Sequence, residues 1–251
     1  MIFHPNVIIV GIGGCSRSGK TLLSKELINQ FYNHIDINSE FSKISFSIHL
    51  DRYFNLEKIR KNQIKTIFGN SYGNWEFPGA IDWDIFYLDI QKKIKEIDYH
   101  IKNSSNPNTK GVLFIEGFLL FSPHLSNINE QNNYLNLYDY YIYICLDKTK
   151  AKERRMKTTR VPDDYYDCIL WPEHIKYCSK YVDFFKNLKN NNKKFLIING
   201  NKEYDIKSVS LCILKWMNIC SNNIDNYIYN NLFIGYESQL NLLENNFSKY
   251  L

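Results

Sequence analysis

A glycine-rich stretch near the N-terminus carries the clearest chemical signal in this sequence. It reads GCSRSGKT, from Gly14 to Thr21, and fits the pattern G-x-x-x-x-G-K-[ST]. In a loop of this kind the backbone amides surround phosphate oxygens at the start of a helix. Lys20 would reach the outer phosphates, and the hydroxyl of Thr21 would hold magnesium. The stretch therefore predicts a site for a nucleotide and Mg²⁺.

The residues on either side of this loop supply the context that a phosphate-binding loop requires. Residues 7–12 form an apolar run that is typical of a buried strand. Residues 21–31 place apolar side chains on one helical stripe, at Leu22, Leu23, Leu27, Ile28 and Phe31. A strand before the loop and an amphipathic helix after it favour nucleotide binding over a simple glycine-rich turn.

Two carboxylates end other apolar runs. Asp51 ends the second run, in SIHLDRYF, and Glu116 ends the third, in FIEGFLLF. The C-terminal ends of parallel strands face the crevice where ligands bind. Asp51 would accept a proton from a hydroxyl that attacks the γ-phosphate, or support magnesium, and Glu116 would hold magnesium through water. The alternatives are a strand-end acid paired with Arg52 or Arg60, and an acid near a helix start.

Two further stretches offer cations and an aromatic face. RRMKTTR crowds cations on a predicted helix, where Arg155 and Arg160 would close over phosphates. The alternative for this stretch is a solvated basic face. NWEFPGAIDW sets Trp75 beside Glu76, a pairing that suits a base and a ribose diol. A core Trp with a surface Glu is the alternative there.

Length and composition limit the class of protein. The chain has 251 residues, 44% of them hydrophobic, and a formal net charge of +5, which fits one globular domain or one domain with an appendage. No Lys/Arg block stands apart, so an anionic small substrate is favoured over nucleic acid. The six cysteines include no CxxC pair, and we find neither a secretory signal nor a membrane-spanning run. We expect a cytoplasmic monomer or homodimer with reduced thiols.

Apolar runs alternate with helical patterns along the chain. The runs predict strands at residues 7–12, 44–50, 112–115, 140–146 and 194–199. Helices are predicted at residues 21–31, 82–101, 148–159, 172–188 and 205–218. In the second helix we expect Asp82 as the cap and Ile85, Leu88, Ile94 and Ile97 on the apolar face. This alternation predicts an α/β fold with a parallel sheet that helices cover on both faces.

The same patterns predict the domain organisation. Residues 1–220 would form one domain, with a lid at about residues 154–170. Residues 221–251 would form an Asn-rich extension with one helix around residues 239–247. A GTPase is disfavoured, because NKEYD at residues 201–205 has one residue too many for the base-reading motif N-K-x-D.

Taken together, GCSRSGKT, HLDRYF, NWEFPGAID, LFIEGFLLF, RRMKTTRV and YYDCILWPEHIKY resemble the nicotinamide riboside kinases, within the uridine kinase-like branch of P-loop kinases. The resemblance runs from about Val7 to about Asn218. It implies a P-loop NTPase fold, with the five predicted strands in one parallel sheet and a small lid. It also implies transfer of the γ-phosphate of ATP to the 5′-hydroxyl of a nucleoside, with Mg²⁺ as cofactor.

The resemblance assigns roles residue by residue. Asp51 would be the general base and Lys20 the cation on the transferred phosphate, while magnesium would be served by Thr21, Asp51 and Glu116. Trp75 would stack on the base, and Glu76 would bind the ribose hydroxyls. The ATP site would comprise Gly14, Cys15, Ser16, Arg17, Ser18, Gly19, Lys20, Thr21, Leu22, Arg155, Asn199, Asn201 and Lys202. The substrate site would comprise Asp51, Arg52, Tyr53, Phe54, Trp75, Glu76, Lys157 and Arg160.

Several departures from the family pattern concern the acceptor. Arg52 stands where a second acid is common, and Glu76 stands where an Asp is usual. Pro162 occupies the place of an aromatic that closes on the nicotinamide ring, in a lid loop that is several residues shorter. Tyr165 and Tyr166 are the candidates to replace that aromatic.

Nicotinamide riboside is the favoured acceptor on this resemblance, and two alternatives stay open. A uridine or cytidine kinase is the first, because P-x-A-x-D after the aromatic is shared with that neighbouring family. A nucleotide-binding regulator without turnover is the second, and it is disfavoured by the intact set Lys20, Thr21, Asp51 and Glu116.

Overall fold

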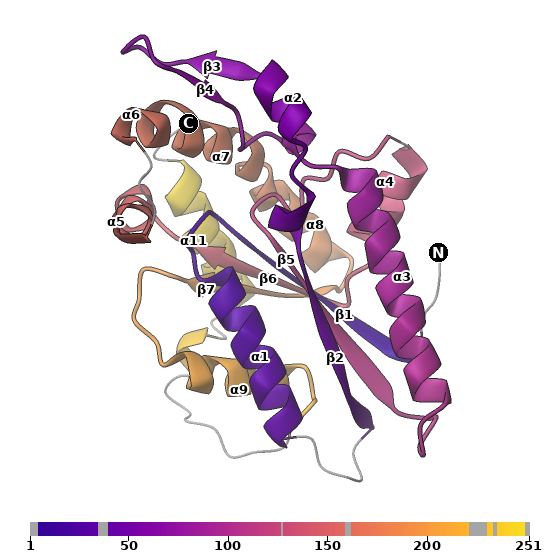
Figure 1. Cartoon of the computed structure of the whole chain (residues 1–251). Coiled ribbons are helices and arrows are strands. Elements are labelled where there is room, and N and C mark those ends of the chain that lie inside the picture. Colours follow the sequence, from indigo (N-terminus) through magenta and orange to yellow (C-terminus); the bar gives the residue numbers. More distant parts are fainter. Residues whose placement is uncertain are drawn as a thin grey trace.

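The fold is built on a parallel sheet with the order β2–β5–β1–β6–β7 (Figure 1). The computed structural model describes residues 5–34, 40–126, 128–158, 162–220, 230–232 and 235–248. The five strands are β1 (Val7–Gly14), β2 (Phe41–His49), β5 (Lys110–Gly117), β6 (Tyr140–Cys145) and β7 (Lys194–Asn199). Every neighbouring pair is parallel, so the predicted α/β fold class is confirmed.

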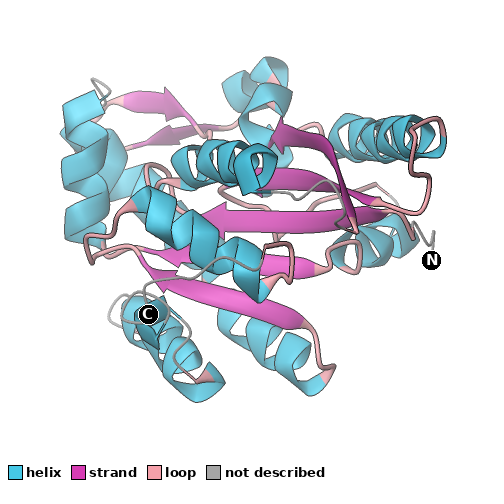
Figure 2. Cartoon of the chain, turned by 90° about the horizontal axis from the view of Figure 1, so that it is seen from below, coloured by secondary structure: helices cyan, strands magenta, loops and turns pink. Residues whose placement is uncertain are grey.

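Helices lie on both sides of this sheet (Figure 2). One face is covered by α1 (Lys20–His34) and α9 (Ile206–Trp216), and the other by α3 (Trp83–Lys102), α8 (Tyr181–Asn190) and α11 (Tyr236–Phe247). Strand side chains alternate between the faces, so that Ile9 belongs to one apolar core while Val10 and Ile12 belong to the other. Burial on both faces explains why the central strands are continuous apolar runs.

The remaining helices lie in the connections between strands. They are α2 (Leu56–Lys61), α4 (Ile128–Leu135), α5 (Lys148–Thr158), α6 (Asp163–Tyr165) and α7 (Trp171–Cys178). The single helix predicted at residues 172–188 is two helices, because the chain turns at Ser179 and Lys180 between α7 and α8. Among the described residues, no helix has both the length and the apolar character that crossing a bilayer requires.

A small hairpin between β2 and α3 was not predicted. β3 (Gln63–Lys65) pairs with β4 (Ser71–Gly73) in antiparallel register, and Gly69 supplies the positive φ of 89° in the turn. Three-residue strands are too short to show an alternating pattern in the sequence. In Figure 1 the hairpin stands above the sheet, next to α6.

The predicted apolar faces of two helices need correction. In α3, Ile85 and Leu88 are more than half exposed, and the buried stripe instead contains Phe86 and Ile90, together with the predicted Ile94 and Ile97. Apolar residues stand at neighbouring positions of this helix, so the sequence left two possible choices for its buried face. Packing against the sheet buries the face that contains Phe86.

In α1, Leu22 is 59% exposed, whereas Leu23, Leu27 and Phe31 are buried. The predicted cap of α3 also differs in detail. Asp82 stands at the cap position of α3, but its carboxylate accepts from Asn55 and Lys58 and makes no capping hydrogen bond.

Helix α11 packs onto the edge of the sheet. Its buried face contains Leu240, Leu243 and Phe247, which join the core that lies between the sheet and α8. The Gln239 side chain accepts a hydrogen bond from the backbone N–H of Ile197 at 2.8 Å. Because β7 is an edge strand, this bond satisfies a backbone group that a bare edge would leave unpaired.

Truncation of Leu243 tests whether α11 contributes to the stability of the core. Leu243→Ala removes a fully buried side chain and should lower the free energy of unfolding by about 2–5 kcal/mol in urea denaturation. The matched control is Leu88→Ala on the exposed side of α3, which should change it by no more than about 0.5 kcal/mol. Equal effects of the two variants would show that α11 does not contribute to the cooperative fold.

Candidate active site

The loop between β1 and α1 is shaped by two glycines. Gly14 has a φ of 147°, and a Cβ there would lie 2.6 Å from Ser18 Oγ and 2.7 Å from the carbonyl oxygen of Ile144. Gly19 has a φ of 106°, which side chains rarely allow. The spacing of the motif therefore marks the two points where the backbone must turn.

The loop closes around one carbonyl oxygen. The Cys15 carbonyl accepts from the Lys20 ammonium at 2.9 Å and from the Ser18 N–H at 3.1 Å. Lys20 is only 7% exposed, and Thr21 follows it in the first turn of α1. The first N–H groups of a helix have no partner within the helix, so this end of α1 is suited to phosphate oxygens.

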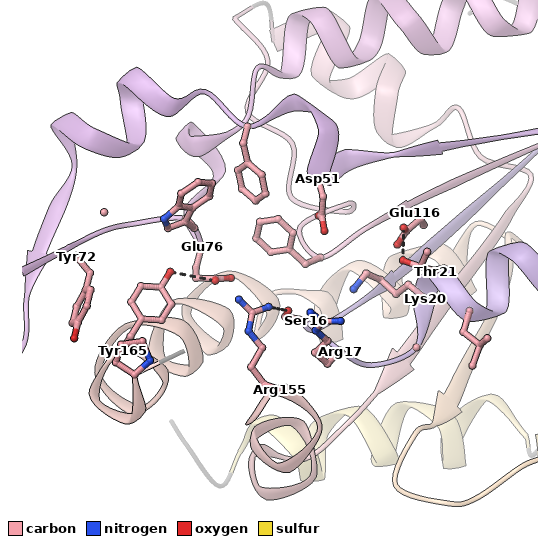
Figure 3. Close-up of a pocket in the computed structure, with 17 residues that line it drawn as sticks. Ser16, Arg17, Lys20, Thr21, Asp51, Tyr72, Glu76, Glu116, Arg155 and Tyr165 are labelled. Carbon is pink, nitrogen blue, oxygen red and sulfur yellow. Dashed lines mark hydrogen bonds between the residues drawn. The ribbon is translucent and has the colours of Figure 1, made fainter. Parts of the chain in front are cut away.

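Thr21 meets Glu116 at the end of β5. The Thr21 hydroxyl donates to Glu116 Oε1 at 2.7 Å (Figure 3). His49 Nδ1 lies 2.5 Å from the same oxygen. Glu116 is buried, and His49, at the end of β2, was not predicted as part of the site. A hydroxyl and a carboxylate are the hard oxygen ligands that Mg²⁺ prefers, and such sites leave further positions to water and phosphate. The residues present therefore fit the predicted metal.

Asp51 lies in the short helical turn that follows β2 and lines the same cavity as Lys20 and Glu116. Figure 3 shows its carboxylate pointing into this cavity. The side chain is accessible to solvent through the cavity, yet protein atoms surround it closely enough to desolvate it. This desolvation raises its pKa, Lys20 opposes the increase, and Glu116 adds to it.

The cavity in front of the loop has a volume of about 820 Å³. Phe54, Trp75 and Phe118 form an aromatic wall, in which Phe54 stacks on Phe118 at 5.9 Å and meets Trp75 edge-on at 5.1 Å. Trp75 is 38% exposed, so its ring remains accessible from the cavity.

Glu76 lies at the far side of the cavity, opposite the loop between β1 and α1 (Figure 3). It is 8% exposed, and Tyr165 donates a hydrogen bond to Glu76 Oε1 at 3.4 Å. Burial raises the pKa of Glu76 to about 7, and the nearby Arg155 guanidinium opposes this increase.

Arg155 lies between the loop and Glu76. Its Nη1 donates to Ser16 Oγ at 2.5 Å, which ties α5 to the phosphate loop (Figure 3). Its buried Nε has no hydrogen-bond partner within the described part of the chain. A cation with a free buried donor beside this loop is suited to an anion.

A second cavity, of about 630 Å³, lies along the other side of the loop. Arg17, Gly19 and Leu22 line both cavities, so the loop separates the two. The second cavity is also lined by the apolar side chains Leu23, Ile144, Ile198, Ile206 and Val209 and by the ring of Tyr204. Its size and apolar lining are suited to a nucleobase.

Several predicted site residues lie elsewhere. Arg52 and Tyr53 line a separate surface hollow between β2 and α3, where the Tyr53 hydroxyl donates to Asp89. Lys157 lines the second cavity and not the cavity of Trp75 and Glu76. Asp51 and Phe54 are three positions apart, and a 3₁₀ turn has three residues per turn, so they lie on the same side and reach the main cavity, whereas Arg52 and Tyr53 between them do not.

The predicted residues in the turn after β7 also have other contacts. The Asn201 side chain accepts from the Asp147 N–H and so joins this turn to the segment after β6, and the Asn199 side chain accepts from the Asn201 N–H within the turn. Lys202 lines the second cavity. Arg160 lies outside the described residues.

Sequence reasoning missed Tyr72, Gly73 and Phe118 as cavity residues. Phe118 stands two positions after Glu116, so the strand-end carboxylate was a usable signal for it. Of the two candidate tyrosines, Tyr165 lines the cavity, while Tyr166 stacks on Trp171 and donates to the Lys148 carbonyl.

The fold and the loop together define an α/β protein with a P-loop. No family model matches the chain. Its sequence is 26% identical to nicotinamide riboside kinase 2 of Mus musculus over 179 residues, which cover 68% of this chain and 79% of that protein. It is also 26% identical to the interferon-induced GTP-binding protein Mx1 of Mus musculus over 146 residues, which cover 58% of this chain but only 21% of Mx1.

Solved structures with a similar arrangement include small kinases. Shikimate kinase from Bacteroides thetaiotaomicron has a TM-score of 0.37 at 12% identity, with 84% of this chain and 98% of that chain covered. A sugar kinase from Janibacter sp. has a TM-score of 0.45 at 10% identity, with 86% of this chain and 99% of that chain covered.

The raised pKa of Glu76 predicts a pH dependence of stability. Folded Glu76 keeps its proton up to a pH of about 7, whereas the unfolded chain releases it near 4.5. The free energy of unfolding should therefore fall as the pH rises through this range, and Glu76→Gln should remove about 3 kcal/mol of that fall. Urea denaturation at about pH 5 and about pH 8 measures the difference.

The control for this measurement is Glu57→Gln, whose side chain is 76% exposed and should leave the pH dependence as in the wild type. If Glu76→Gln and the wild type lost the same stability between the two pH values, Glu76 would not be the protonated group.

Proposed function

We propose that this protein is a small-molecule kinase that transfers the γ-phosphate of ATP to the 5′-hydroxyl of a ribonucleoside. The observation that carries the proposal is the shared cavity of Lys20, Asp51, Glu76 and Glu116, in which the phosphate loop faces an aromatic wall and a buried carboxylate. The sequence similarity to nicotinamide riboside kinase 2 supports the same class of reaction.

The donor would lie along the loop. The second cavity would hold the base of ATP, and the triphosphate would cross the loop at Gly19, which lines both cavities. Lys20 would exchange its bond to the Cys15 carbonyl for the outer phosphates, where charge develops during transfer. Thr21 and Glu116 would hold Mg²⁺, which neutralises phosphate charge when it is bound.

Asp51 would act as the general base. The 5′-oxygen would form a bond to the γ-phosphorus, its proton would pass to the Asp51 carboxylate, and the bond to the bridging oxygen of ADP would break. The raised pKa of Asp51 suits this role, because a carboxylate with a higher proton affinity is a stronger base. Arg155 would stabilise the transferring phosphoryl group with its buried Nε, which has no hydrogen-bond partner among the described residues.

We propose nicotinamide riboside as the acceptor. Its ring is cationic, and a cation over an indole face gains about 0.5–2 kcal/mol that neutral uracil does not. Trp75 offers such a face, and Glu76 would bind the ribose diol and attract positive charge.

A uridine or cytidine kinase is the second candidate, and one observation favours it. Glu76 has a pKa of about 7, so near neutral pH it carries only part of a negative charge. A protonated Glu76 attracts a cation less and can donate a hydrogen bond to a neutral nucleoside.

Replacement of Asp51 tests the proposed base. Asp51→Asn keeps the shape of the side chain but cannot accept the proton, so kcat should fall by about 10²–10⁴-fold while the KM for ATP changes little. Steady-state assays with radiolabelled ATP measure both constants. Asp183→Asn on α8 is the control and should retain wild-type kcat. An Asp51→Asn enzyme with normal kcat and weakened acceptor binding would make Asp51 a substrate ligand instead.

The choice of acceptor is tested with nicotinamide riboside, uridine, cytidine and adenosine in the same assay. Wild type should prefer nicotinamide riboside, and Trp75→Leu should raise its KM more than the KM for uridine, because only the cationic ring loses the electrostatic term. A wild-type preference for uridine, or an equal effect of Trp75→Leu on both substrates, would support the pyrimidine alternative.

Lys20→Ala should abolish turnover of every acceptor, because the charge on the transferring group loses its fixed cation. Retained activity in that variant would contradict the kinase proposal itself.

A further inference from the structure

The β3–β4 hairpin and helix α6 meet at one carboxylate, that of Asp164. Its Oδ2 accepts from Thr66 Oγ1 at 3.1 Å and from Asn70 Nδ2 at 2.8 Å. Its Oδ1 accepts from the Tyr72 hydroxyl at 3.0 Å and from the Tyr165 N–H at 3.0 Å. Three residues of the hairpin and one of α6 are thus joined across more than 90 positions of the sequence.

This arrangement matches an ionised carboxylate. Two carboxylate oxygens offer about four acceptor sites, and all four contacts to Asp164 are donors. The Asn70 hydrogen bond contributes most to lowering the pKa of Asp164, so the group stays charged at neutral pH. The neighbouring Asp163 differs, because its carboxylate is 80% exposed and lies 3.6 Å from the Lys152 ammonium.

Two of the four residues that Asp164 joins lie in the wall of the acceptor cavity, whereas Thr66 and Asn70 do not line it. Tyr72 and Tyr165 both line the cavity, and their rings meet edge-on at 5.5 Å. Tyr165 also donates to Glu76, the proposed ligand of the ribose diol. A displacement of α6 relative to the hairpin would therefore move the Tyr165 hydroxyl away from Glu76.

The hairpin needs such support. A two-stranded hairpin is at best marginally stable by itself, and each strand of this one has three residues. Its tip carries Ile67 and Phe68, which are 86% and 70% exposed and so add little burial. At its base, Asn74 donates to Glu173 of α7 at 3.3 Å, so side-chain hydrogen bonds hold the hairpin both near its tip, at Asp164, and at its base.

We infer that Asp164 is a positioning residue for the acceptor: it holds the β3–β4 hairpin against α6 and thereby fixes Tyr165 on Glu76 and the width of the acceptor cavity. This role rests on the proposed function. Loss of the Asp164 contacts should weaken acceptor binding but neither ATP binding nor phosphoryl transfer, because the phosphate loop, Asp51 and the second cavity lie outside the hairpin and α6.

Asp164→Asn is the variant that tests this inference. It replaces one acceptor oxygen by an amide donor, which would then face donors from the hairpin. The KM for the acceptor should rise about tenfold, which corresponds to the loss of one hydrogen bond to a charged group, while kcat and the KM for ATP should change by less than about twofold. Asp163→Asn is the matched control and should leave all three constants unchanged.

A coupling measurement separates positioning from a general loss of structure. Tyr72→Phe removes one of the four donors and should raise the KM for the acceptor in the same direction, but it should have little further effect in the Asp164→Asn background. Amide hydrogen exchange of residues 63–73 should become faster in Asp164→Asn and not in Asp163→Asn.

Three results would overturn the inference while leaving the kinase proposal intact: equal acceptor KM values for Asp164→Asn and Asp163→Asn, additive effects of Asp164→Asn and Tyr72→Phe, or a parallel loss of ATP binding and thermal stability in Asp164→Asn. Failure of the proposed function has a different signature, because the wild-type enzyme would then phosphorylate none of the tested nucleosides. The positioning role would fall with it, and the exchange data would still show whether Asp164 holds the hairpin.

Discussion

The site depends on the absence of a side chain at Gly14. A Cβ at this position would lie within 2.7 Å of both Ser18 Oγ and the Ile144 carbonyl oxygen, so the loop could not close with any other residue there. Closure brings the Cys15 carbonyl to Lys20 and begins α1 at the edge of the sheet. Because the strands are parallel, their C-terminal ends lie at this same edge, and Asp51 and Glu116 reach the loop as a consequence.

Charge in the cavity is the next constraint. Asp51, Glu76 and Glu116 share it with Lys20 and Arg155, and burial raises the pKa of both Asp51 and Glu76 while the cations oppose the increase. In the proposed reaction a triphosphate would add negative charge to a space that already holds three acids. Transfer would therefore require the cations and Mg²⁺ to balance that charge, and it would use the raised proton affinity of Asp51 to remove the acceptor proton.

The sequence predicted well what local patterns determine. Long apolar runs located all five strands of the sheet, and the glycine spacing located the loop. It predicted poorly what packing or a short turn determines. Arg52 and Tyr53 adjoin Asp51 in sequence but face another side, and the apolar stripe of α3 could not be chosen from its two phases without the sheet. The three-residue strands of the hairpin, and therefore the wall that contains Tyr72, left no readable pattern.

In the proposed kinase, the loop and the strand-end acids that the sequence located would carry out phosphoryl transfer, and the hairpin residues that it missed would help to bind the acceptor. The loop follows β1, Glu116 lies in β5 and Asp51 stands two positions after β2, so the sheet positions the residues proposed for phosphoryl transfer. The acceptor wall comes from connections outside the sheet, where few contacts such as Asp164 with the hairpin and Tyr165 with Glu76 set its geometry. Substitutions in those connections can therefore change which acceptor is bound without disturbing Lys20 or Asp51.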